Sequence, residues 1–485
     1  MGSHRTRARR PDSTHHPRRV LSRHHRRPSL LILRPVIQHH HRRDVAHRLR
    51  IGMLAVLVAL ALPTVAGAQG AGASTARAGG LAGGLAEGLA GRVAGRDSLV
   101  VSVLTMGQGA ALFDQFGHAS VRVRNLTTGL DSAWNWGMYD FNAPGFIPRF
   151  LAGDTRYWME GFPSGALIDY YRRSGRAVWE QELSFNTEEA DSLLTYLRWN
   201  ALPENKFYRY DYFRDNCATR VRDVLDGILQ GELTRTITGD AYGVTWRGET
   251  IRLVDEFPVI GFGMNFALGA PADATVSAWE ALFIPMRLRD AIRTVKVRRA
   301  GEADRALVSH EVELAPVGLY VEAAAPRSFF AGALTLGMAL ALAVLLTGNA
   351  AATSAVARNV VRVMGVTWHF VAGMSGTLVL LAGLMTHHLF MGANTGVLLG
   401  TPVSLALVVL MIPAWSRTPD TRRLRLAATL SLFTCGAAIL ALIAHAVPSV
   451  APANLAAVAL ALPVHAAFAY LLRLRAASLP TGVAA

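Results

Sequence analysis

Residues 116–124 read FGHASVRVR, and residues 210–223 read YDYFRDNCATRVRD. The first stretch alternates small or apolar residues with polar ones, as a β-strand with one buried face does. In the second stretch Asp215 and Asn216, residue types that cap helices, stand directly before an apolar-periodic run. The two stretches predict a strand that carries His118 mid-way along it and a helix that starts at Cys217, both in one mixed α and β domain.

Cys217 is a candidate nucleophile. The chain has only one other cysteine, Cys435, which lies inside a long apolar run, so no disulfide partner is expected within the domain. A structural, buried cysteine is the alternative, but the neighbours Asp215, Asn216 and Arg220 are polar. Since a helix start favours negative charge, we expect the pKa of the Cys217 thiol to be lowered.

His118 is the candidate base for this thiol. Its neighbours Gly117 and Ala119 are small and leave room for another element to approach the imidazole. A third group should orient the ring; Asn135 is the first candidate, and Asp131 and Asp140 remain open. In the same region Asn216 and Arg220 are candidate substrate-binding residues, and a solvated helix face is the alternative for Arg220.

The surrounding segments give the expected secondary structure of a domain that covers 97–325. Stretches 99–107, 118–126 and 132–141 read as strands. Stretch 187–202 reads as a helix capped by Thr187, and stretch 217–231 as a helix stopped by Gly231.

The first 50 residues carry 14 arginines and a net charge of +12 out of the chain's +15. Because this charge is confined to a leader that cannot form a core, nucleic-acid binding is not expected. We interpret 1–50 as a disordered basic leader, 51–68 as a signal peptide or anchor, and 69–96 as a Gly/Ala-rich linker. The domain that follows is then exported.

Five apolar runs after Pro326 predict an all-α transmembrane domain over 326–475 and a cytoplasmic tail over 476–485. The connections expected in the cytoplasm carry arginines, whereas the external connections THHLFMGANT and PSVAPAN carry neither Lys nor Arg. His388 and Asn394 lie in the first external connection, on the side of the catalytic domain. They are candidate substrate-binding residues, with interfacial capping as the alternative. The expected spans are 329–347, 361–385, 396–414, 426–447 and 453–472.

Three stretches resemble one bacterial family: FGHASVRVR, WNWGMYDFNAPGFIPRFLAGDTRYWM (134–159) and ALPENKFYRYDYFRDNCATRVRDVL (201–225). They are similar to the periplasmic N-terminal domain of the Bacteroides-type lipoprotein N-acyltransferases. The resemblance covers about 97–325, where ALFIPMRLRDAI fits its end, and the order of His before Cys resembles permuted papain-like (NlpC/P60-like) proteins. It implies an α+β permuted papain-like domain with Cys217 as acyl-accepting nucleophile and His118 as base. The long basic leader departs from the family.

The resemblance implies a thiol acyltransferase in the bacterial inner membrane, with its catalytic domain in the periplasm. Its partners would be a phospholipid acyl donor, a diacylated lipoprotein acceptor and the membrane. The alternatives are an NlpC/P60-like cysteine peptidase or amidase acting on cell-wall peptides, and a non-enzymatic membrane scaffold. No cofactor is expected, and no metal, because the soluble domain has no metal-ligand spacing.

Overall fold

The computed structural model describes residues 98–239, 243–299, 301–316, 318, 320–446 and 454–479. The expected leader (1–50), signal segment (51–68) and linker (69–96) lie outside the described residues.

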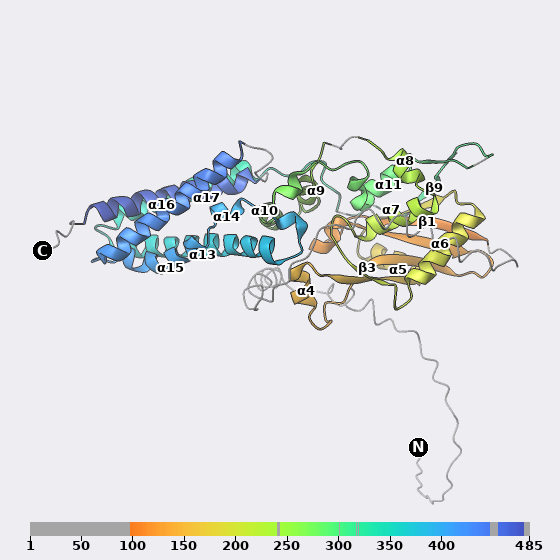
Figure 1. The fold of residues 1–485 in the computed structure, drawn as a ribbon, viewed down its shortest axis with the longest axis horizontal. Coiled ribbons are helices and arrows are strands. Elements are labelled where there is room, and N and C mark those ends of the chain that lie inside the picture. Colours follow the sequence, from red (N-terminus) through yellow and green to blue (C-terminus); the bar gives the residue numbers. More distant parts are fainter. Residues whose placement is uncertain are drawn as a thin grey trace, which may run out of the picture. The chain divides into compact units, whose positions relative to one another are not determined.

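The N-terminal part is an α/β domain built on a seven-stranded sheet in which neighbouring strands are antiparallel (Figure 1). The strand order is β6-β4-β3-β2-β1-β5-β9, so β1 and β2 lie at its centre. A separate hairpin joins β7 (Lys296–Val297) to β8 (Arg305–Ala306). The strands of the large sheet are β1 (Leu99–Met106), β2 (His118–Asn125), β3 (Asp131–Met138), β4 (Arg156–Pro163), β5 (Val178–Leu183), β6 (Phe207–Arg209) and β9 (Val308–Ala315).

Helices cover both faces of this sheet, because the central strands are apolar on both sides. Val101 and Val103 of β1 pack in the cluster that contains residues of α6, α7 and α11, whereas Leu104 and Met106 pack with α5. Helix α7 thereby lies against β2, and this packing positions the first residue of α7 at one end of the central strands. The helices of this part are η1 (Leu112–Phe116), α4 (Phe146–Ala152), α5 (Ser164–Arg173), α6 (Thr187–Asn200), α7 (Cys217–Ile228), α8 (Glu232–Thr236), α9 (Trp246–Leu253), α10 (Pro258–Ala267), η2 (Ala270–Asp273), η3 (Glu280–Phe283) and α11 (Pro285–Ile292).

Several local predictions are corrected in detail. His118 is the first residue of β2, not a central one, because Gly117 with φ 67° ends η1 and turns the chain into the strand. Helix α6 is capped by Asn186 in a capping box with Glu189, one residue before the expected cap Thr187. Helix α7 already ends at Ile228, and Gly231, with φ 85°, forms the turn into α8.

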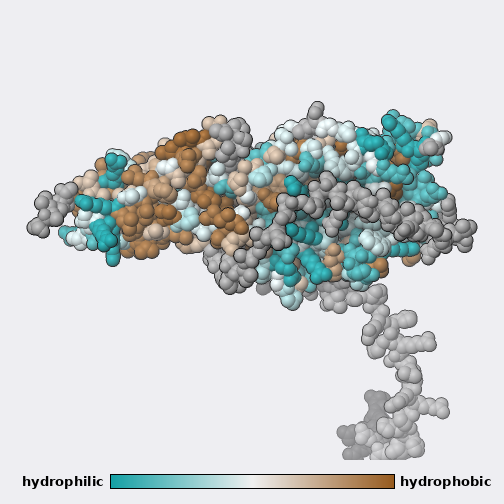
Figure 2. Space-filling model, in the orientation of Figure 1, coloured by the Kyte–Doolittle hydropathy of each residue, from teal (hydrophilic) through white to brown (hydrophobic). Residues whose placement is uncertain are grey.

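The C-terminal part contains the five expected apolar helical regions, each long enough to cross a membrane. Figure 2 shows hydrophobic residues gathered over the surface of these helices. The third region is broken at Gly400–Pro402 into α14 (Gly396–Leu399) and α15 (Val403–Ala414), as the proline there cannot continue the hydrogen-bond ladder. The other regions are α12 (Phe330–Ala350), α13 (Ala355–Met385), α16 (Thr421–Ala444) and α17 (Leu455–Ala477).

The connection between α13 and α14, residues 386–395, is bonded to the α/β domain. The backbone N–H of His387 donates to the carbonyl of Ala152 at 2.8 Å, and that of Gly269 donates to the carbonyl of Phe390 at 2.7 Å. Phe390 is buried in an aromatic cluster with Phe213. This connection, which contains the 3-10 turn η4 (Leu389–Met391), is therefore packed into the domain that carries Cys217.

Candidate active site

Cys217 is the first residue of α7, at a helix start that the local sequence specifies closely. The side-chain oxygen of Asn216 accepts from the backbone N–H of Thr219 at 3.0 Å, and the Thr219 hydroxyl accepts from the N–H of Asn216 at 2.8 Å. This reciprocal cap leaves the N–H groups of Cys217 and Ala218 free of intrahelical partners and directed towards the sulfur. The Cys217 residue as a whole is half-buried.

The expected lowering of the Cys217 pKa is not found. Burial raises the pKa of the thiol above its ordinary value, and this effect outweighs the N–H groups of Ala119, Ala218 and Cys217, which lower it. The sequence pattern identified the helix start but not the desolvation caused by packing against the sheet. The resting side chain is accordingly a thiol, and a base is needed to make it a nucleophile.

His118 is hydrogen-bonded to Asn135, the first of its three candidate partners. The His118 Nε2 and Asn135 Oδ1 atoms lie 3.1 Å apart, and the Asn135 Nδ2 donates to the carbonyl of Ala133, which fixes the amide orientation. Because Oδ1 can only accept, Nε2 carries the proton and Nδ1 keeps a lone pair. Asp131 instead forms an ion pair with Arg122, and Asp140 accepts from the backbone N–H of Asn142.

Cys217 lies beside the start of β2, the strand whose first residue is His118. The thiol lies beside the backbone N–H of Ala119, the residue next to His118. Within the described chain, however, the Cys217 sulfur and the His118 ring share no hydrogen bond. Catalytic hydrogen bonds are often long without substrate and tighten in the complex. We predict that the Cys217 sulfur and the His118 ring come within hydrogen-bond distance during the reaction.

The His118 ring stacks on Tyr171 of α5, with centroids 6.1 Å apart and planes inclined by 18°. Burial lowers the pKa of His118 to about 4, the hydrogen bond with Asn135 raises it in part, and the nearby charge of Arg176 lowers it further. His118 is therefore a neutral imidazole at neutral pH, the form that can accept a proton.

Arg176 is a charged residue of this site that the sequence did not single out. It is 5% exposed, its guanidinium lies 4.6 Å from the centre of the Tyr171 ring, and it pairs with Asp114 at 2.8 Å. Its positive charge lowers the pKa of both His118 and Cys217. No motif marks an arginine in the turn after a helix, so only its contacts with Asp114 and Tyr171 reveal it.

Two of the expected substrate-binding residues are used within the protein. Besides capping α7, Asn216 donates from Nδ2 to the carbonyls of Tyr212 and Phe283 at 2.8 and 2.9 Å. Arg220 forms a two-pronged ion pair with Asp215 and lies 4.2 Å from the Tyr208 ring centre. These contacts of Asn216 and Arg220 stabilise the segment that precedes Cys217.

The residues expected near the membrane are also engaged. The His388 Nδ1 lies 3.0 Å from the Tyr212 hydroxyl and its ring stacks on the Tyr212 ring, while Nε2 lies 3.2 Å from the carbonyl of Phe150. Burial lowers the pKa of His388, which favours its neutral form. Asn394 binds backbone carbonyls at the end of α10. Both residues bond the 386–395 connection to the α/β domain.

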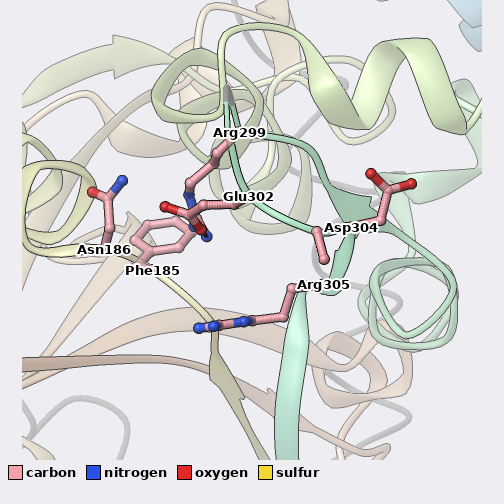
Figure 3. A pocket seen from close by; sticks show the side chains of 7 residues that line it. Phe185, Asn186, Arg299, Glu302, Asp304 and Arg305 are labelled. Atoms are coloured by element: carbon pink, nitrogen blue, oxygen red, sulfur yellow. Dashed lines mark ion pairs between the residues drawn. The ribbon is translucent and has the colours of Figure 1, made fainter.

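A surface pocket of about 480 Å³ lies away from these residues, beside the β7–β8 hairpin (Figure 3). Arg299 in its wall pairs with Glu189 and lies 3.7 Å from Glu302, so its charge is already balanced. None of the candidate catalytic residues lines it, and it adds nothing to the site around Cys217. It is lined by Phe185, Asn186, Arg299, Glu302, Ala303, Asp304 and Arg305.

Residues 94–254 match the family model described as the Lnb N-terminal periplasmic domain. The match covers less than half of the chain and includes His118, Asn135 and Cys217. Neither the curated proteins nor the solved structures contain a match to the chain. Together with the five apolar helical regions, the matched domain fits a multi-pass membrane protein with a periplasmic domain.

Proposed function

We propose that this protein is a cysteine-dependent acyltransferase of the lipoprotein N-acyltransferase type. The observation that carries the proposal is a thiol at a capped helix start, beside a strand whose first residue is an imidazole held by an amide. The matched periplasmic domain and the apolar helices support a substrate that resides in the membrane.

In the first half-reaction the Cys217 sulfur attacks the acyl carbonyl of a phospholipid ester. The thiol proton passes to Nδ1 of His118, an S–C bond forms, and the C–O bond of the ester breaks. His118 then gives the proton to the departing lysophospholipid oxygen, which leaves a thioester on Cys217. The N–H groups that surround the sulfur are in position to stabilise negative charge as it develops.

In the second half-reaction an amine accepts the acyl chain. The acceptor we propose is the N-terminal diacylglyceryl-cysteine of a lipoprotein, whose nitrogen attacks the thioester while its proton passes to His118. An amide bond forms, the C–S bond breaks, and the proton returns to the sulfur. Asn135 has the role of a positioning residue, since it holds the proton of His118 on Nε2 throughout.

The finer assignments of fold and place belong to the same proposal. We propose a permuted papain-like arrangement, supported by the order of His118 before Cys217 and by the packing of α7 on β2. The domain limits remain 97–325 and 326–475, with 476–485 as the tail. The bacterial inner membrane is the proposed location, with Cys217 on the periplasmic side.

The test is the intact mass of the purified full-length protein after incubation with phospholipid vesicles. An adduct of one acyl chain that hydroxylamine removes is expected on the wild type and on Cys435→Ala, the matched control. Cys217→Ala should carry none, and adding a synthetic diacylated lipopeptide should discharge the adduct to a triacylated product.

Other outcomes separate the alternatives. Release of free fatty acid or cleavage of a cell-wall peptide without transfer to the lipopeptide would indicate a hydrolase. A wild-type protein that neither forms an adduct nor turns over any of these substrates would favour a non-enzymatic scaffold and refute the proposal.

A further inference from the structure

Helix α10 (Pro258–Ala267), with the sequence PVIGFGMNFA, is an apolar helix within the α/β part of the chain. It contains no charged residue, and only Gly261 and Asn265 are buried. Val259 is 84% exposed and Ile260 is 37% exposed. A helix that is apolar on its exposed side is not adapted to water, so its surroundings need an explanation.

One side of α10 packs on the membrane helices. The Phe262 ring meets the Phe329 ring edge to face, with centroids 5.8 Å apart, and Phe329 immediately precedes α12. A Cβ atom at Gly396, the first residue of α14, would lie 3.0 Å from the ring of Phe266. Helix α10 therefore lies at the end of the helical bundle where α12 and α14 begin.

The last carbonyls of α10 are bonded to protein donors. The amide of Asn394 donates to the carbonyls of Phe266, Ala267 and Leu268 at 2.8, 2.9 and 3.2 Å. Arg247, which is 3% exposed, donates to the carbonyls of Asn265, Leu268 and Gly269. A helix end in water can use solvent for these groups, whereas a helix end at a lipid surface must satisfy them internally.

We propose that α10 lies in the outer-leaflet interface of the membrane and that Val259 and Ile260 contact lipid acyl chains. The first turns of α12, which follow Phe329, also expose apolar side chains: Phe330 is 41% and Leu334 is 38% exposed. Helix α12 is long and apolar enough to cross a membrane, so we expect these side chains to face lipid. A second copy of the chain is a poor occupant, because stable protein interfaces bury about 800 Å² per partner, far more than two side chains supply.

This placement also bears on how close the candidate active site lies to the bilayer, because α10 is linked by packing to the segment before Cys217. Helix α10 follows α9, whose Trp246 packs with Phe213 and Phe390. Phe213 lies four residues before Cys217. The cluster also contains Leu268, the residue directly after α10, and α10 packs against α9.

The experiment measures the depth of a spin label on the full-length protein in vesicles of phosphatidylethanolamine and phosphatidylglycerol. In a Cys217→Ser, Cys435→Ala background, Val259→Cys is compared with Leu130→Cys. Leu130 is 61% exposed and lies in the β2–β3 hairpin, at the end of β2 opposite His118. Ile260→Cys repeats the measurement in case Val259→Cys fails to fold.

The label at 259 should be several-fold more accessible to oxygen, relative to a water-soluble nickel chelate, than the label at 130. Equal accessibility to the nickel chelate at both positions would overturn the proposal. Spin–spin broadening at 259 that disappears on dilution with unlabelled protein would also overturn it, since a second copy would then cover α10.

Discussion

The two cysteines lie in contrasting regions, at the start of α7 and in the middle of α16. Both cysteine residues are half-buried as a whole, so the exposure of the residue does not distinguish them. Cys217 stands where the helix leaves its N–H groups unbonded, beside the strand that begins with His118. Cys435 stands inside a helix whose N–H groups are bonded to the preceding turn, in a region apolar enough to cross a membrane. The position within the helix, more than burial, decides which thiol has partners for chemistry.

The largest expected effect is the difference in acyl transfer between the variants Cys217→Ala and Cys435→Ala. Cys217→Ala should remove acyl-adduct formation and transfer, a loss of at least about 10³-fold, because no other group can form the covalent intermediate. Cys435→Ala should transfer at the wild-type rate. Intact mass and transfer to a lipopeptide measure both variants, and equal losses in the two would break the contrast between the two helix positions.

The second prediction concerns His118 and Asn135, the candidate catalytic partners of Cys217. His118→Ala should slow thioester formation by about 10²–10⁴-fold, the usual contribution of a general base. Asn135→Ala should slow it less, since the imidazole remains but loses the acceptor that fixes its tautomer. Rates in single-turnover experiments check the order. A larger loss for Asn135→Ala than for His118→Ala would contradict the assigned roles.

The third effect is a shift in pH dependence caused by the charge of Arg176. That charge lowers the pKa of both His118 and Cys217, so Arg176→Gln should raise both. His118 is then protonated at higher pH, so the acidic limb of the plot of rate against pH should move to higher pH. The plot of Cys217 alkylation rate against pH should move to higher pH as well.

Arg172→Gln is the matched control on α5, because Arg172 is exposed and pairs with Asp169. Its profiles should coincide with those of the wild type. Removing Arg176 also leaves Asp114 without its cation, a change that favours imidazolium and acts in the same direction. Unchanged profiles for Arg176→Gln would exclude an electrostatic role.

The smallest effect concerns stability at the junction with the membrane helices. Asn394→Ala would remove this side-chain donor from the carbonyls of Phe266 and Ala267, whereas the carbonyl of Leu268 keeps its bond from Arg247, so unfolding should cost about 1–3 kcal/mol less. Asn142→Ala, at an exposed loop position, should change the midpoint of thermal unfolding little. A midpoint for Asn394→Ala as high as that of the control would show that the 386–395 connection is not held by this side chain.

The sequence identified local features well. The alternation in 118–126 predicted a strand, and the residues before Cys217 predicted a capped helix, because caps and periodicity are short-range properties. The apolar runs predicted the spanning regions to within a few residues at most ends, since length and hydropathy define them. The candidate site residues His118 and Cys217 were named from their neighbours in sequence, and Asn135 was the first of three candidates.

Three matters were decided by the tertiary structure alone. Asn135 bonds His118 because β2 and β3 pair with Ser120 opposite Asn135, a register that spacing does not determine. The thiol pKa is raised because packing on the sheet desolvates the sulfur, an environment that also includes Arg176, which pairs with Asp114 of η1. His388 and Asn394, polar residues near a span end, bond to the α/β domain. Pairing register, desolvation and docking depend on residues far apart in the chain, so local sequence patterns carry no record of them.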